Sequence, residues 1–413
     1  MEILNAVKEI LTYGEVCDNC LGRFFGKRSF GITNNYRGQG LRTAHHLSEN
    51  TPWAGQNGQC PICQDILKDF EVWAEKVILA LKDIQCRTFL LGSKIPPIIS
   101  ETEEMVWSDL SLESPEPIKA EINREVGKIV SLKRDLEVDF KNPEVVILLN
   151  INEGRTSVQI NSLYFKGRYR KFERGIPQTH WNCRNCQGKG CERCGFSGKQ
   201  YNTSVEELIG EEVITTFDAK GVLLHGSGRE DIDARMLGTG RPFIMEIVQP
   251  KIRESNLSLL EKAINLKAAG RVEIDISGWT HKDEVETLKS DKSHKRYRII
   301  VSTDGILSRE TLDNALAELK NATIHQRTPV RVSHRRADKI RDRRVIDIVC
   351  INENSLNFTL EVTGEAGLYI KELISGDEGR TIPSLTQLTG VNARVVTLDV
   401  IAVGTKEETN GTP

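Results

Sequence analysis

The chain has 413 residues, of which 28% are charged and 38% are apolar, and its formal net charge is −2. This composition argues against an intrinsically disordered chain, and no apolar run approaches the roughly 18 residues that a membrane helix requires. The length exceeds what one ordinary core supports, so we expect more than one domain.

Residues 1–85 hold two pairs of cysteines in CxxC spacing. The first residues, MEILNAVKEILTYG, predict an amphipathic helix and lack the features of a signal peptide, so we expect a cytoplasmic protein with no membrane partner. In a reducing compartment such pairs are metal ligands more often than disulfides. A redox role is disfavoured because no thioredoxin-like βαβ pattern accompanies them. The predicted structural zinc ligands are Cys17, Cys20, Cys60 and Cys63.

Helical and strand patterns follow up to residue 175. Apolar residues recur at three- and four-residue steps from Ile66 to Ile84 and predict a long helix. The runs FLLGSK and VVILLNI predict strands, and the segment 116–137 predicts a second helix. The basic run KGRYRKFER at 166–174 contains Tyr169 and Phe172, which we interpret as aromatic side chains that could stack on nucleic-acid bases.

Residues 176–202 form an insert rich in cysteine and glycine. Glycines permit the positive φ values that wrap a backbone around a metal ion. A flexible loop without metal is the alternative, and four clustered thiols disfavour it. The predicted ligands of this second zinc site are Cys183, Cys186, Cys191 and Cys194.

From about residue 203 to residue 405, strands alternate with helices without a regular βα period, which indicates an α+β domain with a largely antiparallel sheet. The stretch 327–344 carries eight Arg or Lys against two Asp. We expect it to contact RNA phosphates. A solvated charged hairpin is the alternative interpretation.

The stretch LLHGSGREDIDARMLGTGRPF, residues 223–243, gathers glycines, arginines and acidic residues. Glycines allow a ligand to approach the backbone closely. A carboxylate set among arginines stays ionised, which suits a nucleophile better than a general acid. On composition alone, a salt-bridged surface turn is nearly as good an explanation.

Gly228-Arg229-Glu230-Asp231 resembles the G-R-x-D motif of pseudouridine synthases. The longer string GREDIDARMLGTGRPF closely resembles that of the archaeal tRNA pseudouridine synthase family that acts on uridines 54 and 55 of the TΨC loop. The resemblance extends over essentially the whole chain, including the cysteine pairs, the cysteine-rich insert and a central region similar to a THUMP domain.

The resemblance implies that Asp231 is the nucleophile, with Asp233 as a disfavoured rival. Tyr297 in KRYRIIVS matches the family's active-site tyrosine, and Lys371 in GLYIKEL matches the basic residue expected to pair with the catalytic aspartate. Extruding a uridine from the tRNA leaves a space that one of two arginines would fill. The remaining residues implied to bind substrate are Tyr369, Leu373, Arg229 and Arg235.

We therefore expect an α+β protein with an N-terminal zinc module and a THUMP-like α/β domain, then a pseudouridine synthase domain with a mixed, largely antiparallel sheet. The expected boundaries are 1–85 for the zinc module, 86–175 for the THUMP-like RNA-binding domain, 176–202 for the cysteine-rich insert and 203–405 for the catalytic domain. The expected partner is tRNA. Structural zinc is expected, but neither an organic cofactor nor a protein partner.

The main alternative is a non-catalytic, zinc-stabilised tRNA-binding protein. Another THUMP-linked modifier, such as a thiolase or methyltransferase, is disfavoured because the sequence has neither a P-loop nor a Rossmann-type glycine loop.

Overall fold

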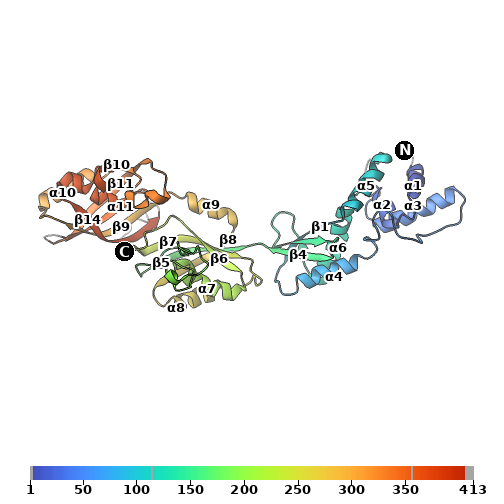
Figure 1. Ribbon diagram of the computed structural model, residues 1–413, viewed down its shortest axis with the longest axis horizontal. Coiled ribbons are helices and arrows are strands. Elements are labelled where there is room, and N and C mark those ends of the chain that lie inside the picture. The colour runs from blue at the N-terminus through green and yellow to red at the C-terminus, as the bar shows by residue number, and fades with distance from the viewer. Residues whose placement is uncertain (1–2, 113–114, 355–356, 405–413) are drawn as a thin grey trace. The chain divides into compact units, whose positions relative to one another are not determined.

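The structure, a computed structural model, describes residues 3–112, 115–354 and 357–404 (Figure 1). The chain divides into two compact units. One comprises Met1–Asn161 and Lys251–Arg253, and the other comprises Ser162–Pro250 and Glu254–Pro413. Within the described residues, no helix is long and apolar enough to cross a membrane.

The first unit begins with three helices, two of which touch through glycines. A Cβ on Gly22 would lie 1.8 Å from the carbonyl oxygen of Asn34, and one on Gly38 would lie 1.9 Å from that of Asp18. Larger residues would therefore force the second and third helices apart. The helices are α1 (Ile3–Leu11), α2 (Asp18–Arg23) and α3 (Asn34–Ser48).

A four-stranded sheet with the order β2-β1-β3-β4 and three further helices form the rest of this unit. β1 is parallel to β2 and β3, whereas β4 is antiparallel to β3. α6 buries an apolar stripe, each residue of which contributes about 1.5–3 kcal/mol; the stripe is Ile118, Ile122, Val126 and Val130. The elements are α4 (Phe70–Ala80), β1 (Thr88–Lys94), α5 (Pro97–Asp109), α6 (Ile118–Arg134), β2 (Glu137–Val138), β3 (Val145–Asn150) and β4 (Arg155–Ile160).

The helix predicted from the apolar periodicity between Ile66 and Ile84 is shorter in the structure. α4 begins at Phe70 because the Asp69 side chain accepts the backbone N–H groups of the next turn at 3.1 and 3.3 Å. The apolar spacing reports which side chains are buried, and it does not show where the helical hydrogen bonds stop.

The second unit is built on a ten-stranded sheet with the order β13-β10-β11-β12-β9-β14-β7-β5-β8, and β6 pairs with β7. Every pairing is antiparallel except that of β14 with β7, so the predicted mixed, largely antiparallel sheet is confirmed. The strands are β5 (Leu163–Lys171), β6 (Gly221–Gly226), β7 (Arg235–Val248), β8 (Val272–Thr280), β9 (His294–Thr303), β10 (Thr323–Arg327), β11 (Ile340–Asn354), β12 (Asn357–Gly364), β13 (Thr381–Ile382) and β14 (Ala393–Gly404).

Helices cover this sheet in two groups. α7 and α8 pack together against β6 and β8, whereas α10, α11 and α12 pack around β11 and β14. The α-helices are α7 (Val205–Phe217), α8 (Leu257–Ala268), α9 (Lys282–Ser290), α10 (Arg309–Leu319), α11 (Ile370–Ser375) and α12 (Leu385–Thr389). The short 3₁₀ helices are η1 (Glu192–Cys194), η2 (Val330–Arg335) and η3 (Asp377–Gly379).

The basic run at 166–174 lies mostly in β5, between β7 and β8, and belongs to the second unit. The run falls inside the range 86–175 expected for the THUMP-like domain. Its alternate side chains are buried, so β5 is a central strand of the larger sheet. Tyr169 is fully buried, and the expectation that it stacks on RNA is therefore wrong.

Candidate active site

The loop between β6 and β7 carries Asp231 at its turn. The backbone N–H of Ala234 donates to the carbonyl of Asp231 at 3.0 Å, which closes the turn. Gly228 has φ +77° and lies against the guanidinium of Arg241, so a side chain at this position would be both strained and crowded. The glycine-rich sequence is therefore required by the shape of this loop.

A buried ion pair fixes the loop from beneath. Glu230 and Arg241 lie 2.8 Å apart with almost no exposure of either side chain. Arg241 also donates to the carbonyl of Ser227 at 2.6 Å, and the hydroxyl of Tyr169 lies 2.9 Å from both carboxylate oxygens of Glu230. Burial opposes the charge on Arg241, but the charge and hydrogen bond of Glu230, together with Tyr169 and Tyr297, outweigh it and raise the pKa of Arg241 above its usual value.

A buried lysine completes the support. The ammonium of Lys171 donates to the carbonyls of Ile176 and Ile232 at 2.8 and 3.2 Å and lies 4.0 Å from Glu230. Gln178 donates to the carbonyl of Gly228 at 3.1 Å. The carboxylate of Glu230 belongs to this network, and both Glu230 and its neighbour Asp231 line a cavity.

Two cations face Asp231. A guanidinium nitrogen of Arg331 lies 3.0 Å from one carboxylate oxygen, and the ammonium of Lys371 lies 3.5 Å from the other. Lys371 is closer to Asp233, at 2.7 Å. The structure thus places Lys371 beside Asp231 as expected, but it also shows that Lys371 is shared with Asp233, whose side chain is 66% exposed against 27% for Asp231.

The cavity beside Asp231 has a volume of about 560 Å³. Tyr297 on β9 and Tyr369, which precedes α11, line it together with Asp231 and Lys371. Burial raises the pKa of Tyr297 to about 12. The positive charge of Arg241 partly opposes this rise, and the negative charge of Asp231 adds to it. Tyr297 is therefore a neutral phenol at physiological pH. Segments far apart in the sequence meet at this one site.

The two arginines predicted to contact substrate lie in different places. Arg229 lines the cavity, with its guanidinium 4.7 Å from the centre of the Trp181 ring. Arg235 is not among the residues that line this cavity, because Asp399 holds it through two bonds of 3.0 and 2.6 Å. Leu373, on α11, is fully buried in the core and does not line the cavity either.

Sequence reasoning missed three residues of this site. Arg331 is one of eight basic residues in the stretch 327–344, and Trp181 lies within the cysteine-rich insert, where the cysteine spacing carries no information about it. Lys295 lines the cavity two residues before Tyr297, and the period of a strand places both side chains on one face. Burial, with the nearby charge of Arg241, lowers the pKa of Lys295 to about 8, against the opposing effect of Asp291.

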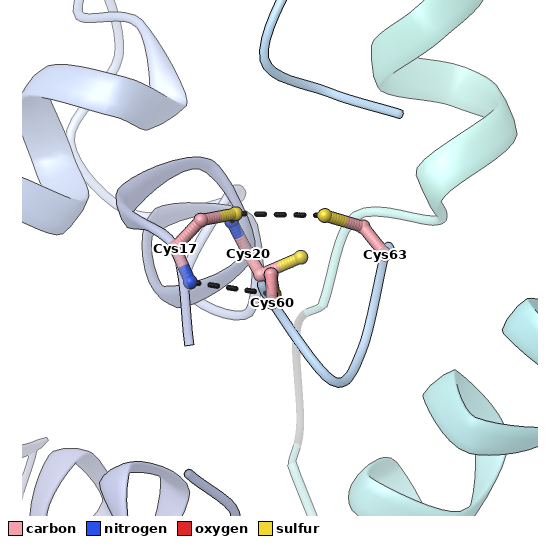
Figure 2. A group of neighbouring side chains, drawn as sticks. All are labelled: Cys17, Cys20, Cys60 and Cys63. Carbon is pink, nitrogen blue, oxygen red and sulfur yellow. Dashed lines mark hydrogen bonds between the residues drawn. The ribbon is translucent and has the colours of Figure 1, made fainter. Parts of the chain in front are cut away.

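The first unit contains the first cysteine cluster (Figure 2). All four sulfur atoms lie within 4.8 Å of one another and are buried. The sulfurs of Cys17 and Cys63 are 3.6 Å apart, and the backbone N–H of Cys17 donates to the sulfur of Cys60 at 3.3 Å. Four thiolates bonded tetrahedrally to one ion at about 2.3 Å would be about 3.8 Å apart. The cluster has the dimensions of a metal site.

The second cluster, in the insert of the second unit, has similar dimensions. The sulfur of Cys191 lies 4.0 Å from that of Cys183 and 3.7 Å from that of Cys194. Backbone N–H groups of Cys191 and Gly198 point to the sulfur of Cys194 at 3.2 and 3.3 Å, which favours a thiolate there. This cluster is more exposed than the first, and it could also hold a metal ion.

Both units of the chain match families of known proteins. The family described as "Pus10, C-terminal" matches residues 164–404, and "Pus10 THUMP domain, archaeal" matches residues 73–150. Three proteins named "tRNA pseudouridine synthase Pus10" are similar over nearly their full lengths. Identity is 40% for that of Methanothrix thermoacetophila (98% of this chain, 95% of that protein), 40% for that of Halorubrum lacusprofundi (99% and 98%) and 42% for that of Methanothermobacter marburgensis (98% and 98%).

A chain of the "Crystal Structure of a Cbf5-Nop10-Gar1 Complex" aligns with a TM-score of 0.34 and 14% identity, covering 58% of this chain and 49% of that chain. This likeness is too weak to support an argument.

Because Glu230 and Arg241 form a buried ion pair, we expect the removal of one partner to destabilise the fold strongly. Arg241→Met should lower the free energy of unfolding by about 3–5 kcal/mol, because buried Glu230 would lose its partner at 2.8 Å and keep Lys171 at 4.0 Å. Urea denaturation of the full chain measures this loss. The matched control is Arg309→Met, which removes an exposed arginine 2.9 Å from Asp313 and should cost less than about 0.5 kcal/mol. Equal effects of the two substitutions would contradict a supporting role for the buried pair.

Proposed function

The chain belongs to the Pus10 family, and from this premise we propose that it is a tRNA pseudouridine synthase that isomerises uridines 54 and 55 of the T-loop. One observation carries the proposal at the level of residues. Asp231, Tyr297 and Lys371 come from three distant segments and line a single cavity.

The reaction needs one carboxylate and no organic cofactor. The bond between uracil N1 and sugar C1′ breaks, the uracil turns, and a bond forms between C5 and C1′. C5 loses a proton and N1 gains one, so the composition of the nucleotide is unchanged. Asp231 is the proposed nucleophile, because it lines the cavity and forms ion pairs with Arg331 at 3.0 Å and Lys371 at 3.5 Å.

The target nucleotide must leave the folded T-loop before it can react, at a cost of a few kcal/mol. A cavity of about 560 Å³ lies within the range of small-molecule sites and can accommodate one nucleotide. Tyr297, as a neutral phenol, is suited to stack on the extruded uracil. Arg229, supported by Trp181, is better placed than Arg235 to fill the vacated space.

A non-catalytic tRNA-binding protein would need a basic face but no enclosed carboxylate. The support beneath the G-R-x-D loop, in which buried charges are paired at 2.8 Å, orients Asp231 toward the cavity and adds nothing to a basic surface. Membership of the Pus10 family and the structure of this loop both favour an enzyme over a non-catalytic tRNA-binding protein.

We propose that both cysteine clusters hold structural zinc. Each offers four sulfurs and leaves no position for a reacting water, so zinc would stabilise the fold and take no part in the isomerisation. Thiolate sites require a reducing compartment, which agrees with the predicted cytoplasmic location. The boundaries of the four sequence regions and the absence of an obligatory protein partner stay predictions.

The function is tested with tRNA transcripts labelled with tritium at uracil C5. The purified wild-type chain should release one tritium per modified uridine, and Asp231→Asn should release none while binding tRNA with an unchanged Kd. Transcripts with cytidine at position 54 or 55 assign the modified sites. Tritium release by Asp231→Asn at the wild-type rate would exclude the proposed nucleophile, and binding without release by the wild type would favour the non-catalytic alternative.

The cavity lysine predicts a pH dependence of tRNA affinity. Lys295 is charged below a pKa of about 8 and becomes neutral above it, so the cavity loses one positive charge between pH 7 and pH 9. The Kd for tRNA should therefore rise over this interval. Lys295→Arg keeps its charge throughout and should show a flatter profile, as measured by filter binding at constant ionic strength. Parallel profiles for the two proteins would show that another group is responsible.

The metal content tests the zinc proposal. The wild-type chain should contain two zinc ions by elemental analysis. Cys60→Ser and Cys191→Ser should each contain one. The first substitution should also lower the stability of the first unit strongly, because its cluster is part of the buried core. A full complement of two ions in either variant would contradict the assigned ligands.

A further inference from the structure

Arg331 bridges Asp231 and a second, buried carboxylate. It lies in the 3₁₀ helix η2, one hundred residues after Asp231, and its two ends have different partners. One terminal nitrogen lies 3.0 Å from Asp231. The side-chain Nε and the other terminal nitrogen lie 2.7 and 3.4 Å from the carboxylate of Glu372.

We propose that Arg331 is the positioning residue that holds the Asp231 carboxylate in its reactive orientation, and that Glu372 fixes Arg331 for this purpose. The inference rests on the proposed function and adds two residues to it. Arg331 and Glu372 both lie outside the G-R-x-D motif. In GLYIKEL the matched residues are Tyr369 and Lys371, and Glu372 is the residue that follows Lys371.

The distances favour Arg331 over Lys371 as the main partner of Asp231. Arg331 lies 3.0 Å from Asp231, whereas Lys371 lies 3.5 Å away and is 2.7 Å from Asp233. An ammonium group is a point charge that can shift between two acids, but a guanidinium is a planar fork whose direction is fixed once its far side is bound. Arg331 can therefore define the direction of the carboxylate as well as balance its charge.

Glu372 is suited to the role of anchor. Its side chain is only 5% exposed, and a buried carboxylate needs a cation partner. Among the described residues, Arg331 is the cation that forms an ion pair with it. The pair is then an obligatory contact. Separating Arg331 from Glu372 would leave a carboxylate buried without a countercharge.

The backbone around Arg331 is also held in place. The next residue, Val332, is 3% exposed and lines the same cavity. The N–H of Val330 donates to Asp377 at 3.2 Å, and the hydroxyl of Thr328 donates to the carbonyl of Ala337 at 2.7 Å across the base of the loop. The backbone that carries Arg331 is therefore an anchored turn.

The local charges support the same assignment. Three carboxylates, Asp231, Asp233 and Glu372, share two cations, Arg331 and Lys371. Without Arg331, Lys371 would remain as the partner of both Asp231 and Asp233, and Glu372 would lose its cation. That arrangement would leave Asp231 with a weaker partner and an altered direction.

The rival role for Arg331 is a phosphate contact, as we expected for the whole stretch 327–344. Its three nitrogen atoms are all engaged with carboxylates in the structure, so a phosphate would have to displace Asp231 or Glu372. A phosphate contact contributes to affinity and to its salt dependence, whereas a positioning residue contributes to the rate in the bound complex. The two roles can therefore be separated.

The test measures tritium release under single-turnover conditions and, separately, the Kd for tRNA at two salt concentrations. Arg331→Gln should lower the single-turnover rate about 100-fold, the effect of misplacing a reacting group by about 1 Å, while the Kd changes less than about threefold. Arg331→Lys should recover part of the rate, because it restores the charge but not the fork. Glu372→Gln should lower the rate by about tenfold, since it weakens a charged hydrogen bond.

The matched control is Arg309→Gln, which removes an exposed arginine from an ion pair on α10 and should leave the rate and the Kd unchanged. Thermal melting identifies any variant that is not folded, and Arg331→Lys and Glu372→Gln then carry the test. A normal single-turnover rate in folded Arg331→Gln or Glu372→Gln, or a loss confined to a salt-dependent Kd, would overturn the proposal. A wild-type chain that releases no tritium would instead refute the proposed function.

Discussion

The site depends on the ion pair between Glu230 and Arg241, buried within the second unit at 2.8 Å. Such a pair is costly to break because the remaining partner would lose its direct countercharge in a medium of low dielectric constant, and the next cation to Glu230, Lys171, lies 4.0 Å away. Glu230 is therefore confined to the interior side of the loop. Its neighbour Asp231 lies at the turn, where it lines the cavity. The G-R-x-D motif thus combines one acid that holds the loop with a second acid that lines the cavity and pairs with Arg331 and Lys371.

The rest of the site is assembled on this loop from elements that the sheet brings together. β9 supplies Tyr297, and the start of α11 supplies Lys371 and Glu372. The turn η2 supplies Arg331. Each of these groups is held by ion pairs or by burial, and a site preorganised in this way would need little rearrangement when charge develops in a reaction. The structure explains why the arginine and the lysine beside Asp231 are not equivalent, since one is anchored and the other is shared.

The sequence predicted the parts of the site that depend on local spacing. The cysteine clusters could be identified because each CxxC pair is a local unit, and Asp231, Tyr297 and Lys371 could be matched because their motifs are short. Arg331 could not be singled out, because the sequence does not show which of the eight basic residues in one stretch has its side chain in the cavity. The burial of Tyr169 and Lys171 was also missed, since a basic strand suggests an exposed surface. Arg235 lies next to the motif in sequence, but the bond to Asp399 depends on a strand 164 residues away.

The most direct measurement is a structure of the chain bound to a tRNA that carries 5-fluorouridine at the target position, where fluorine replaces the hydrogen that must leave C5. We predict that this nucleotide lies outside the T-loop stack, with the Asp231 carboxylate bonded to its sugar or within about 3–3.5 Å of it and the Tyr297 ring against its base. A target sugar that lies beyond the reach of Asp231, on another face of the second unit, would contradict the account.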